Sequence, residues 1–125
     1  MIKGIGIDVV EISRIENMIN KYQNHFIDKV FTEQEKEYCN KMANPAIHFS
    51  GRWAAKEAFY KALPNICQQF SNWKSIEITN KENNIPFVKI LDNKLKEKIK
   101  EANIENIYIS ISHEKSICAA IVIME

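Results

Sequence analysis

Apolar residues recur along this chain with two different periodicities, and the change between them comes about halfway along the sequence. After an opening strand at 2–12, the first half has the spacing of three and four residues that is typical of amphipathic helices. The second half alternates between apolar and polar positions at 74–79, 86–91 and 106–113, which predicts half-buried strands. The continuous apolar run at 117–124, which follows Ser116, predicts a final buried strand at 116–124.

Helices are expected at 13–22, 24–30, 32–42, 46–63 and 92–102. Two of their starts have capping-box spacing, since Ser13 is followed by Glu16 and Thr32 by Glu35. Pro64 helps to end the longest helix, which is dense in alanine and aromatic residues and is therefore expected to be packed on most sides.

We summarise the order as β-α-α-α-β-β-α-β-β, an α+β fold with a mostly antiparallel sheet packed against a long central helix. The length predicts one domain, 1–125, and neither an internal repeat nor a linker is visible. Gly4 and Gly6 lie within the first strand, so they indicate close backbone approach and not a dinucleotide-binding turn, which also lacks its third glycine.

Composition narrows the classes of function. Lys+Arg totals 17 and Asp+Glu 16, a balance that argues against a non-specific nucleic-acid binder. The longest apolar run, 117–124, is far too short to span a membrane. Three cysteines at wide spacing indicate neither a disulfide framework nor a zinc site, and we expect a cytoplasmic protein with reduced thiols. Only two arginines occur, Arg14 and Arg52, and arginine offers a rigid fork that suits carboxylate or phosphate. Composition alone favours two ordinary surface residues.

The long helix carries the first candidate site, which includes Arg52, Lys56, Glu57 and Lys61. The plain alternative is an exposed ion pair between Glu57 and Lys61, which are one turn apart and share a face. Against it, the surrounding alanines leave little freely solvated surface. A partly buried acid beside cations suggests a site for phosphate and metal.

Asp8 is the second candidate, because an acid inside an apolar strand lies either at an exposed edge or at a site. Asp8 and Glu57 together, without nearby histidine or cysteine ligands, suit a hard cation such as Mg²⁺. Sequence leaves open whether the two meet. His113 ends a strand and by itself reads as a turn residue, and its neighbour Ser112 points to the opposite face, which argues against a Ser–His hydrolase.

Three segments of the sequence, taken together, resemble one protein family. They are 6–15 (GIDVVEISRI), 51–63 (GRWAAKEAFYKAL) and 110–114 (SISHE), and the segment 31–35 (FTEQE) agrees as well. In this order, in a chain of this length, they resemble the bacterial holo-acyl-carrier-protein synthases, which are small phosphopantetheinyl transferases.

The resemblance implies an enzyme that moves 4′-phosphopantetheine from coenzyme A to a serine of apo acyl carrier protein, releases adenosine 3′,5′-bisphosphate and supports fatty acid biosynthesis. It implies that Asp8 and Glu57 hold Mg²⁺ and that Lys61 reaches a phosphate oxygen. By the same resemblance, Arg52 and His113 bind the nucleotide's phosphates. Either Glu57 or a metal-bound water takes the proton of the carrier serine.

The resemblance also implies a homotrimer with active sites between subunits, and an acidic carrier docked on Arg14 with support from Lys21. Two other readings stay open. One is a Mg²⁺-dependent nucleotide pyrophosphatase that uses water as its nucleophile. The other is a non-enzymatic module that binds an acidic protein.

Overall fold

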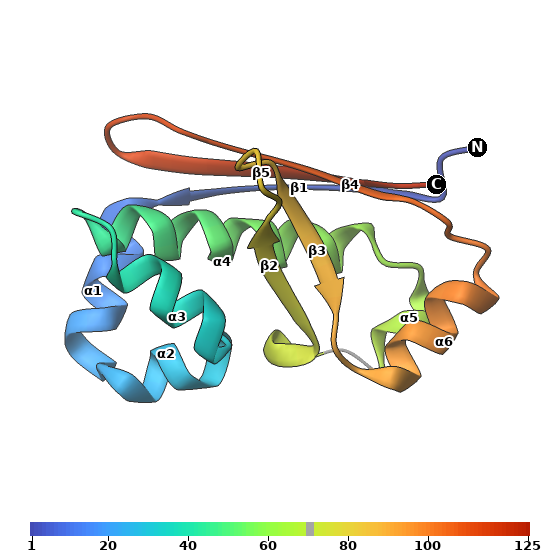
Figure 1. The fold of residues 1–125 in the computed structure, drawn as a ribbon, viewed down its shortest axis with the longest axis horizontal. Helices are drawn as coiled ribbons and strands as arrows, with labels where there is room; N and C mark the ends of the chain where they lie inside the picture. Colours follow the sequence, from blue (N-terminus) through green and yellow to red (C-terminus); the bar gives the residue numbers. More distant parts are fainter. Residues whose placement is uncertain (70–71) are drawn as a thin grey trace.

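A three-stranded antiparallel sheet and one long helix form the centre of the computed structural model, which describes residues 1–69 and 72–125. The sheet has the order β1-β5-β4, with β5 (Ile117–Met124) between the edge strands β1 (Gly4–Glu11) and β4 (Ile107–His113). Figure 1 labels the three strands and views their sheet from its edge. Asp8 pairs with Ala120, which pairs in turn with Ile111. Cross-strand partners share a face, so this register fixes which side chains point toward the helix.

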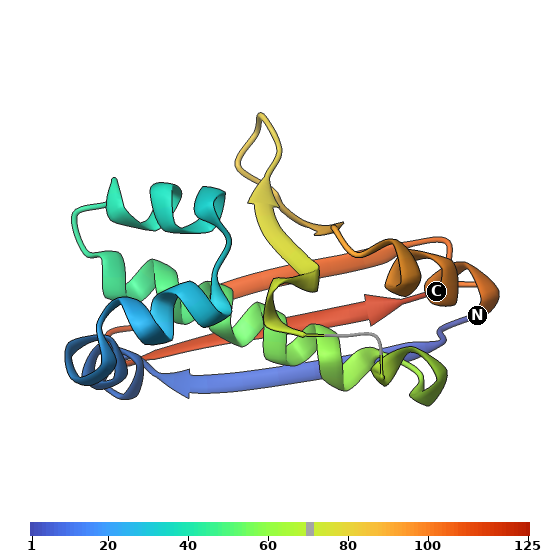
Figure 2. The same ribbon diagram turned by 90° about the horizontal axis from the view of Figure 1, so that it is seen from below.

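The long helix α4 (Pro45–Ala62) packs across one face of the sheet. Figure 2 shows the three strands side by side, with α4 lying over them. Near its start, a Cβ added at Gly51 would lie 3.3 Å from the Ile111 side chain of β4. Near its end, Cβ atoms at Gly4 and Gly6 would overlap the carbonyl oxygens of Ala62 and Ala58. The helix therefore runs from β4 toward β1, and glycine is required in β1 because strand and helix backbones touch there.

The remaining elements surround α4. Before it come α1 (Ile12–Tyr22), α2 (Asn24–Val30) and α3 (Glu33–Asn40); after it come α5 (Asn65–Gln68), a 3₁₀ turn (Trp73–Ser75), the hairpin β2 (Ile76–Asn80) and β3 (Pro86–Ile90), and α6 (Asn93–Glu101). In Figure 1 the helices lie on one side of the sheet. None of the described helices combines the length and apolarity needed to pass through a bilayer.

The opposite face of the sheet is open and apolar. Ile5, Ile7 and Val9 of β1 are each about 60% exposed, and Tyr108 of β4 and Ile117 of β5 are also exposed. These five residues define what we call the open sheet face. Contiguous exposed apolar surface on a small protein marks an interaction site.

The predicted fold class and its antiparallel sheet are confirmed. The summarised order has three helices before the second strand, whereas the structure has five, α1 to α5, before β2. The sequence predicted the first four by their ranges, and the short α5 was not expected. The capping box at Thr32 and Glu35 forms, with Glu35 Oε1 accepting from the Thr32 backbone N–H at 2.9 Å. The box at Ser13 was wrong, because α1 already begins at Ile12, where the chain leaves β1.

Beneath α4, one buried ion pair ties several elements together. The Lys56 ammonium lies 2.7 Å from Glu35 Oε1, and both side chains are fully buried. It also donates to the carbonyl oxygens of Val30 and Trp73, each at 2.7 Å. Glu35 Oε2 accepts from the backbone N–H of Ile78 at 2.8 Å. This pair links α3, α4 and β2, so it fixes how α3 and the hairpin pack on the long helix.

Candidate active site

Asp8, Glu57 and Lys61 meet where α4 crosses β1. Lys61 Nζ donates to Asp8 Oδ1 at 2.9 Å and to the backbone carbonyl oxygen of Ile7 at 3.1 Å. The Asp8 carboxylate is 14% exposed and the Lys61 side chain 52% exposed. An ammonium has three donors, so Lys61 keeps one for an anion arriving from solvent.

The electrostatics of Glu57 connect it with Asp8. Burial raises the pKa of Glu57, and the Asp8 carboxylate raises this pKa further, while Lys61 and Arg14 lower it. Glu57 is half-buried, so its interaction with Asp8 is only partly screened by water. The structure thus brings the two predicted carboxylates together, which the sequence left open.

Two predictions about the residues of α4 between Arg52 and Lys61 were wrong. The surface ion pair between Glu57 and Lys61 does not form, because Lys61 turns to Asp8 instead. Lys56 does not belong to this group of side chains: it points into the core, where burial lowers its pKa and Glu35 partly offsets that effect.

The donor set at this place fits Mg²⁺. Two neighbouring carboxylates repel each other when no cation lies between them, and this repulsion adds to the effect of burial in raising the pKa of Glu57. Among the described residues no group of three or more His, Cys, Asp or Glu side chains gathers in a cage. Mg²⁺ commonly takes one or two protein carboxylates and completes its shell with substrate phosphates and water.

The exposed side of α1 lies close to this pair. Arg14 and Lys21 line a shallow groove of about 460 Å³ together with the apolar Met18 and Tyr22. The charge of Arg14 lowers the pKa of Glu57, so the Arg14 end of the groove is within electrostatic reach of that carboxylate. Its cations and apolar side chains suit an acidic, partly apolar partner.

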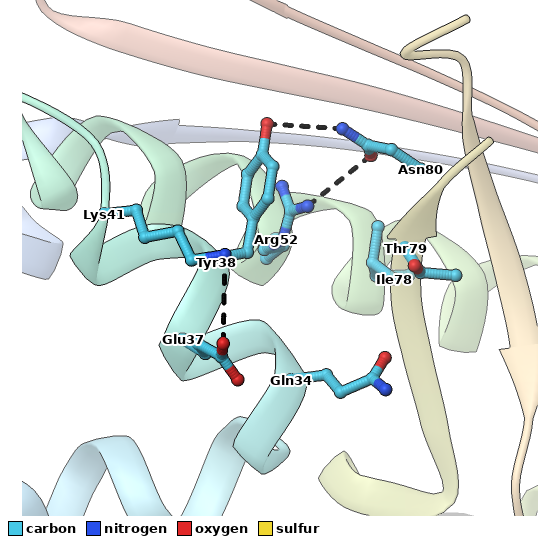
Figure 3. A pocket seen from close by; sticks show the side chains of 8 residues that line it. All are labelled: Gln34, Glu37, Tyr38, Lys41, Arg52, Ile78, Thr79 and Asn80. Carbon is cyan, nitrogen blue, oxygen red and sulfur yellow. Dashed lines mark hydrogen bonds and ion pairs between the residues drawn. The ribbon is translucent and has the colours of Figure 1, made fainter. Parts of the chain in front are cut away.

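Arg52 and His113 lie elsewhere, near His48 in the first half of α4. His48 connects them, because its pKa is lowered by burial and then by the charges of Arg52 and His113. The His113 side chain lies at the exposed end of β4, opposite the buried Cys118. Arg52 is 5% exposed and lines a cavity of about 290 Å³ between α3, α4 and β2 (Figure 3).

The two groups of side chains therefore occupy opposite flanks of α4. Arg52 and Glu57 are five residues apart, which separates them by roughly 140° around a helix. Asp8 and His113 lie on the two edge strands, with β5 between them. Within one chain, the structure joins Asp8, Glu57 and Lys61 but does not bring Arg52 and His113 to them.

Sequence reasoning missed two residues of the cavity beside Arg52, namely Tyr38 on α3 and Asn80 at the end of β2. Arg52 lies over the Tyr38 ring at 3.9 Å and reaches Asn80 Oδ1 at 3.5 Å. Neither residue belongs to a motif. Each lies on a different element from Arg52 and far from it in the sequence, so no local pattern could have indicated them.

Comparison with known proteins gives a consistent result. The family model of the 4′-phosphopantetheinyl transferase superfamily matches residues 4–122. The holo-[acyl-carrier-protein] synthase of Halothermothrix orenii is 40% identical over 125 residues, covering 100% of this chain and 98% of that protein. The similarity therefore includes both ends and the middle of the chain.

Solved structures resemble the fold over the same extent. The crystal structure of holo-[acyl-carrier-protein] synthase from Neisseria meningitidis matches with a TM-score of 0.87 and 26% identity, covering 100% of this chain and 99% of that one. The Bacillus anthracis synthase, crystallised in complex with CoA (3′,5′-ADP), matches with a TM-score of 0.79 and 29% identity over 99% of this chain and 96% of that one.

Proposed function

Since the chain belongs to the holo-[acyl-carrier-protein] synthases of the 4′-phosphopantetheinyl transferase superfamily, and is therefore a phosphopantetheinyl transferase, we propose that it modifies an apo acyl carrier protein in a Mg²⁺-dependent reaction with coenzyme A. The observation that carries this proposal is the meeting of Asp8, Glu57 and Lys61 at the crossing of β1 and α4. The product would serve fatty acid biosynthesis.

The transfer forms one bond and breaks one. The hydroxyl oxygen of a carrier serine attacks the coenzyme A phosphorus that bears pantetheine. The bond from that phosphorus to the bridging oxygen of the pyrophosphate breaks, and its electron pair leaves with adenosine 3′,5′-bisphosphate. The serine proton would pass to a base, either the Glu57 carboxylate or a water held by the metal.

Asp8, Glu57 and Lys61 each have a part in this step. Asp8 and Glu57 would hold Mg²⁺, which when bound neutralises charge on the pyrophosphate. Lys61, held by Asp8 and the Ile7 carbonyl, would donate its third N–H to a phosphate oxygen and stabilise the charge that develops there. Because this lysine is already oriented, little reorganisation accompanies the reaction.

Arg52 and His113 would bind the 3′-phosphate end of the nucleotide. Since they lie on the other flank of α4, one coenzyme A molecule would reach both groups most readily across two copies of the chain. The open sheet face supplies the apolar surface that such an assembly needs. Both features support a homotrimer in which one subunit gives Asp8, Glu57 and Lys61 and its neighbour gives Arg52 and His113.

Co-expression of two inactive variants tests this arrangement. We expect Glu57→Gln and Arg52→Ala to be nearly inactive as pure trimers. In a mixed trimer, a site is complete when one subunit has an intact Glu57 and its neighbour has an intact Arg52. With equal amounts of the two variants and random assortment, roughly one quarter of the sites are complete. Turnover per trimer and the mass by light scattering are measured together. If mixed trimers stay as inactive as either parent, the site lies within a single subunit.

The groove on α1 is the proposed carrier surface. We expect Arg14→Ala to raise the KM for an acidic carrier by about 3–10-fold and to leave the KM for coenzyme A unchanged, because the lost contact is with the carrier alone. Steady-state kinetics at two salt concentrations measure this effect, which should shrink as salt rises. Lys115→Ala, at the exposed turn after β4, serves as the control, and an equal effect there would show that overall charge is responsible.

Release of nucleotide with and without the carrier separates the proposed transferase from its alternatives. We expect adenosine 3′,5′-bisphosphate to appear only when coenzyme A, Mg²⁺ and apo carrier are all present. A pyrophosphatase would release nucleotide without the carrier, and a binding module would release none under either condition. Chromatography of the nucleotides gives the answer directly.

A further inference from the structure

Arg52 is held in place by two side chains that no catalytic motif contains. Its guanidinium lies 3.9 Å from the centre of the Tyr38 ring, within the range of a strong cation–π contact. Its Nη2 donates to Asn80 Oδ1 at 3.5 Å. Figure 3 shows the Tyr38 ring and the Arg52 guanidinium side by side, with Asn80 reaching both.

The three side chains form a closed set of contacts. Asn80 Nδ2 donates to the Tyr38 hydroxyl oxygen at 3.2 Å, while its Oδ1 accepts from Arg52. The amide of Asn80 is therefore engaged at both ends, and the ring restrains the plane of the guanidinium. A long side chain that would otherwise sample many rotamers is thereby fixed in one orientation.

Among the described residues, no carboxylate lies close enough to neutralise the charge of Arg52. Arg52 is 5% exposed, yet no carboxylate among residues 1–69 and 72–125 forms an ion pair with it. In the same residues its Nε is the one buried side-chain nitrogen or oxygen without a hydrogen-bond partner. Glu37 lines the same cavity, but its carboxylate pairs with Lys41 at 3.8 Å. A buried cation with a free donor is costly unless an anion completes it.

We propose that Tyr38 and Asn80 are positioning residues that hold Arg52 ready for a phosphate, and that they set the preference of this cavity for a nucleotide carrying a 3′-phosphate. The inference rests on the proposed part of Arg52 in binding coenzyme A. It adds that recognition of the 3′-phosphate depends on two side chains that act through Arg52. Loosening either one weakens the contact with that phosphate and leaves the rest of the nucleotide's contacts as they are.

Calorimetric titration of the assembled protein with adenosine 3′,5′-bisphosphate and with adenosine 5′-monophosphate tests this inference. The wild type should bind the bisphosphate more tightly. Tyr38→Leu and Asn80→Ala should each weaken bisphosphate binding by about tenfold, in line with the loss of one cation–π or charged hydrogen-bond contact, and leave the monophosphate unchanged. Tyr38→Phe keeps the ring and should retain most of the preference.

Gln34→Ala is the matched control, because Gln34 lines the same cavity from the same helix and its loss should leave the ratio of the two affinities unchanged. Equal weakening of both ligands by Tyr38→Leu would show a purely structural role and overturn the inference, as would an unchanged ratio. The mass of the carrier, measured with the same preparations, reports the proposed transfer separately. If the wild type fails to transfer the group while Tyr38→Leu and Asn80→Ala still lower the ratio of the two affinities, the proposed function is wrong and the assignment of Tyr38 and Asn80 stands.

Discussion

Replacing Glu57 by glutamine should lower turnover by about 10²–10³-fold and leave the fold intact, because it removes one of the two carboxylates of the proposed metal site without changing the shape of the side chain. Turnover is measured by the gain in carrier mass per unit time, and the fold by circular dichroism. Glu97→Gln, at an exposed position of α6, is the matched control and should retain full turnover.

The same substitution should stabilise the metal-free protein. Burial and Asp8 raise the pKa of Glu57 above its ordinary value of 4.5, so the charged carboxylate weakens folding at neutral pH. Protonation removes this cost as the pH falls from the raised value toward 4.5. Glu57→Gln should therefore have the higher Tm at pH 7, and the difference should vanish near pH 4.

Mg²⁺ should reverse that order, because a ligand that binds the folded state raises the Tm of the protein that binds it. Wild type should gain stability with Mg²⁺ and the variant should gain little. Turnover of Glu57→Gln close to that of wild type, or equal Mg²⁺ stabilisation of both, would contradict the assignment of Glu57 as a metal ligand.

Replacing Lys56 by methionine should cost about 3–5 kcal/mol of stability, because it leaves the Glu35 carboxylate buried without its cation. The carbonyl oxygens of Val30 and Trp73 also lose their donor. Urea unfolding measures the loss. Since small domains are stable by only about 5–15 kcal/mol, a change of this size removes a large part of the stability.

Lys36→Met is the control for Lys56, because Lys36 forms two ion pairs, at 2.7 Å with Asp28 and at 2.6 Å with Glu33, on the surface of the protein. Its urea midpoint should change little, since water screens exposed pairs. The double variant Lys56→Met with Glu35→Gln should recover part of the loss. Strictly additive losses in that double variant would show that the two groups do not act as a pair.

Much of this fold could be predicted because its signals are local. Alternation predicted β4, the run of apolar residues predicted β5, and Thr32 with Glu35 marked the start of α3. The start of α1 was predicted less well, because the helix follows β1 directly and needs no side-chain cap at Ser13. The grouping of strands into two sheets depends on long-range pairing, which no local pattern contains.

The candidate site divides in the same way. Asp8, Glu57 and Lys61 could be chosen from residue type and from the resemblance of the blocks around them. The second role of Glu35, as the buried partner of Lys56, could not, because a capping box explains the residue completely at the level of sequence. Tyr38 and Asn80 acquire a role only where α3 and β2 meet Arg52.

The mass of an apo acyl carrier protein, after incubation with this protein, coenzyme A and Mg²⁺, tests the proposed reaction most directly. We expect the intact carrier to gain one phosphopantetheine group. The gain should be absent when a chelator removes the metal, and it should be slowed by about 10²–10³-fold when Glu57→Gln replaces the wild type. An unmodified carrier with coenzyme A consumed, or a full gain of mass with the chelator present, would contradict the proposed Mg²⁺-dependent reaction.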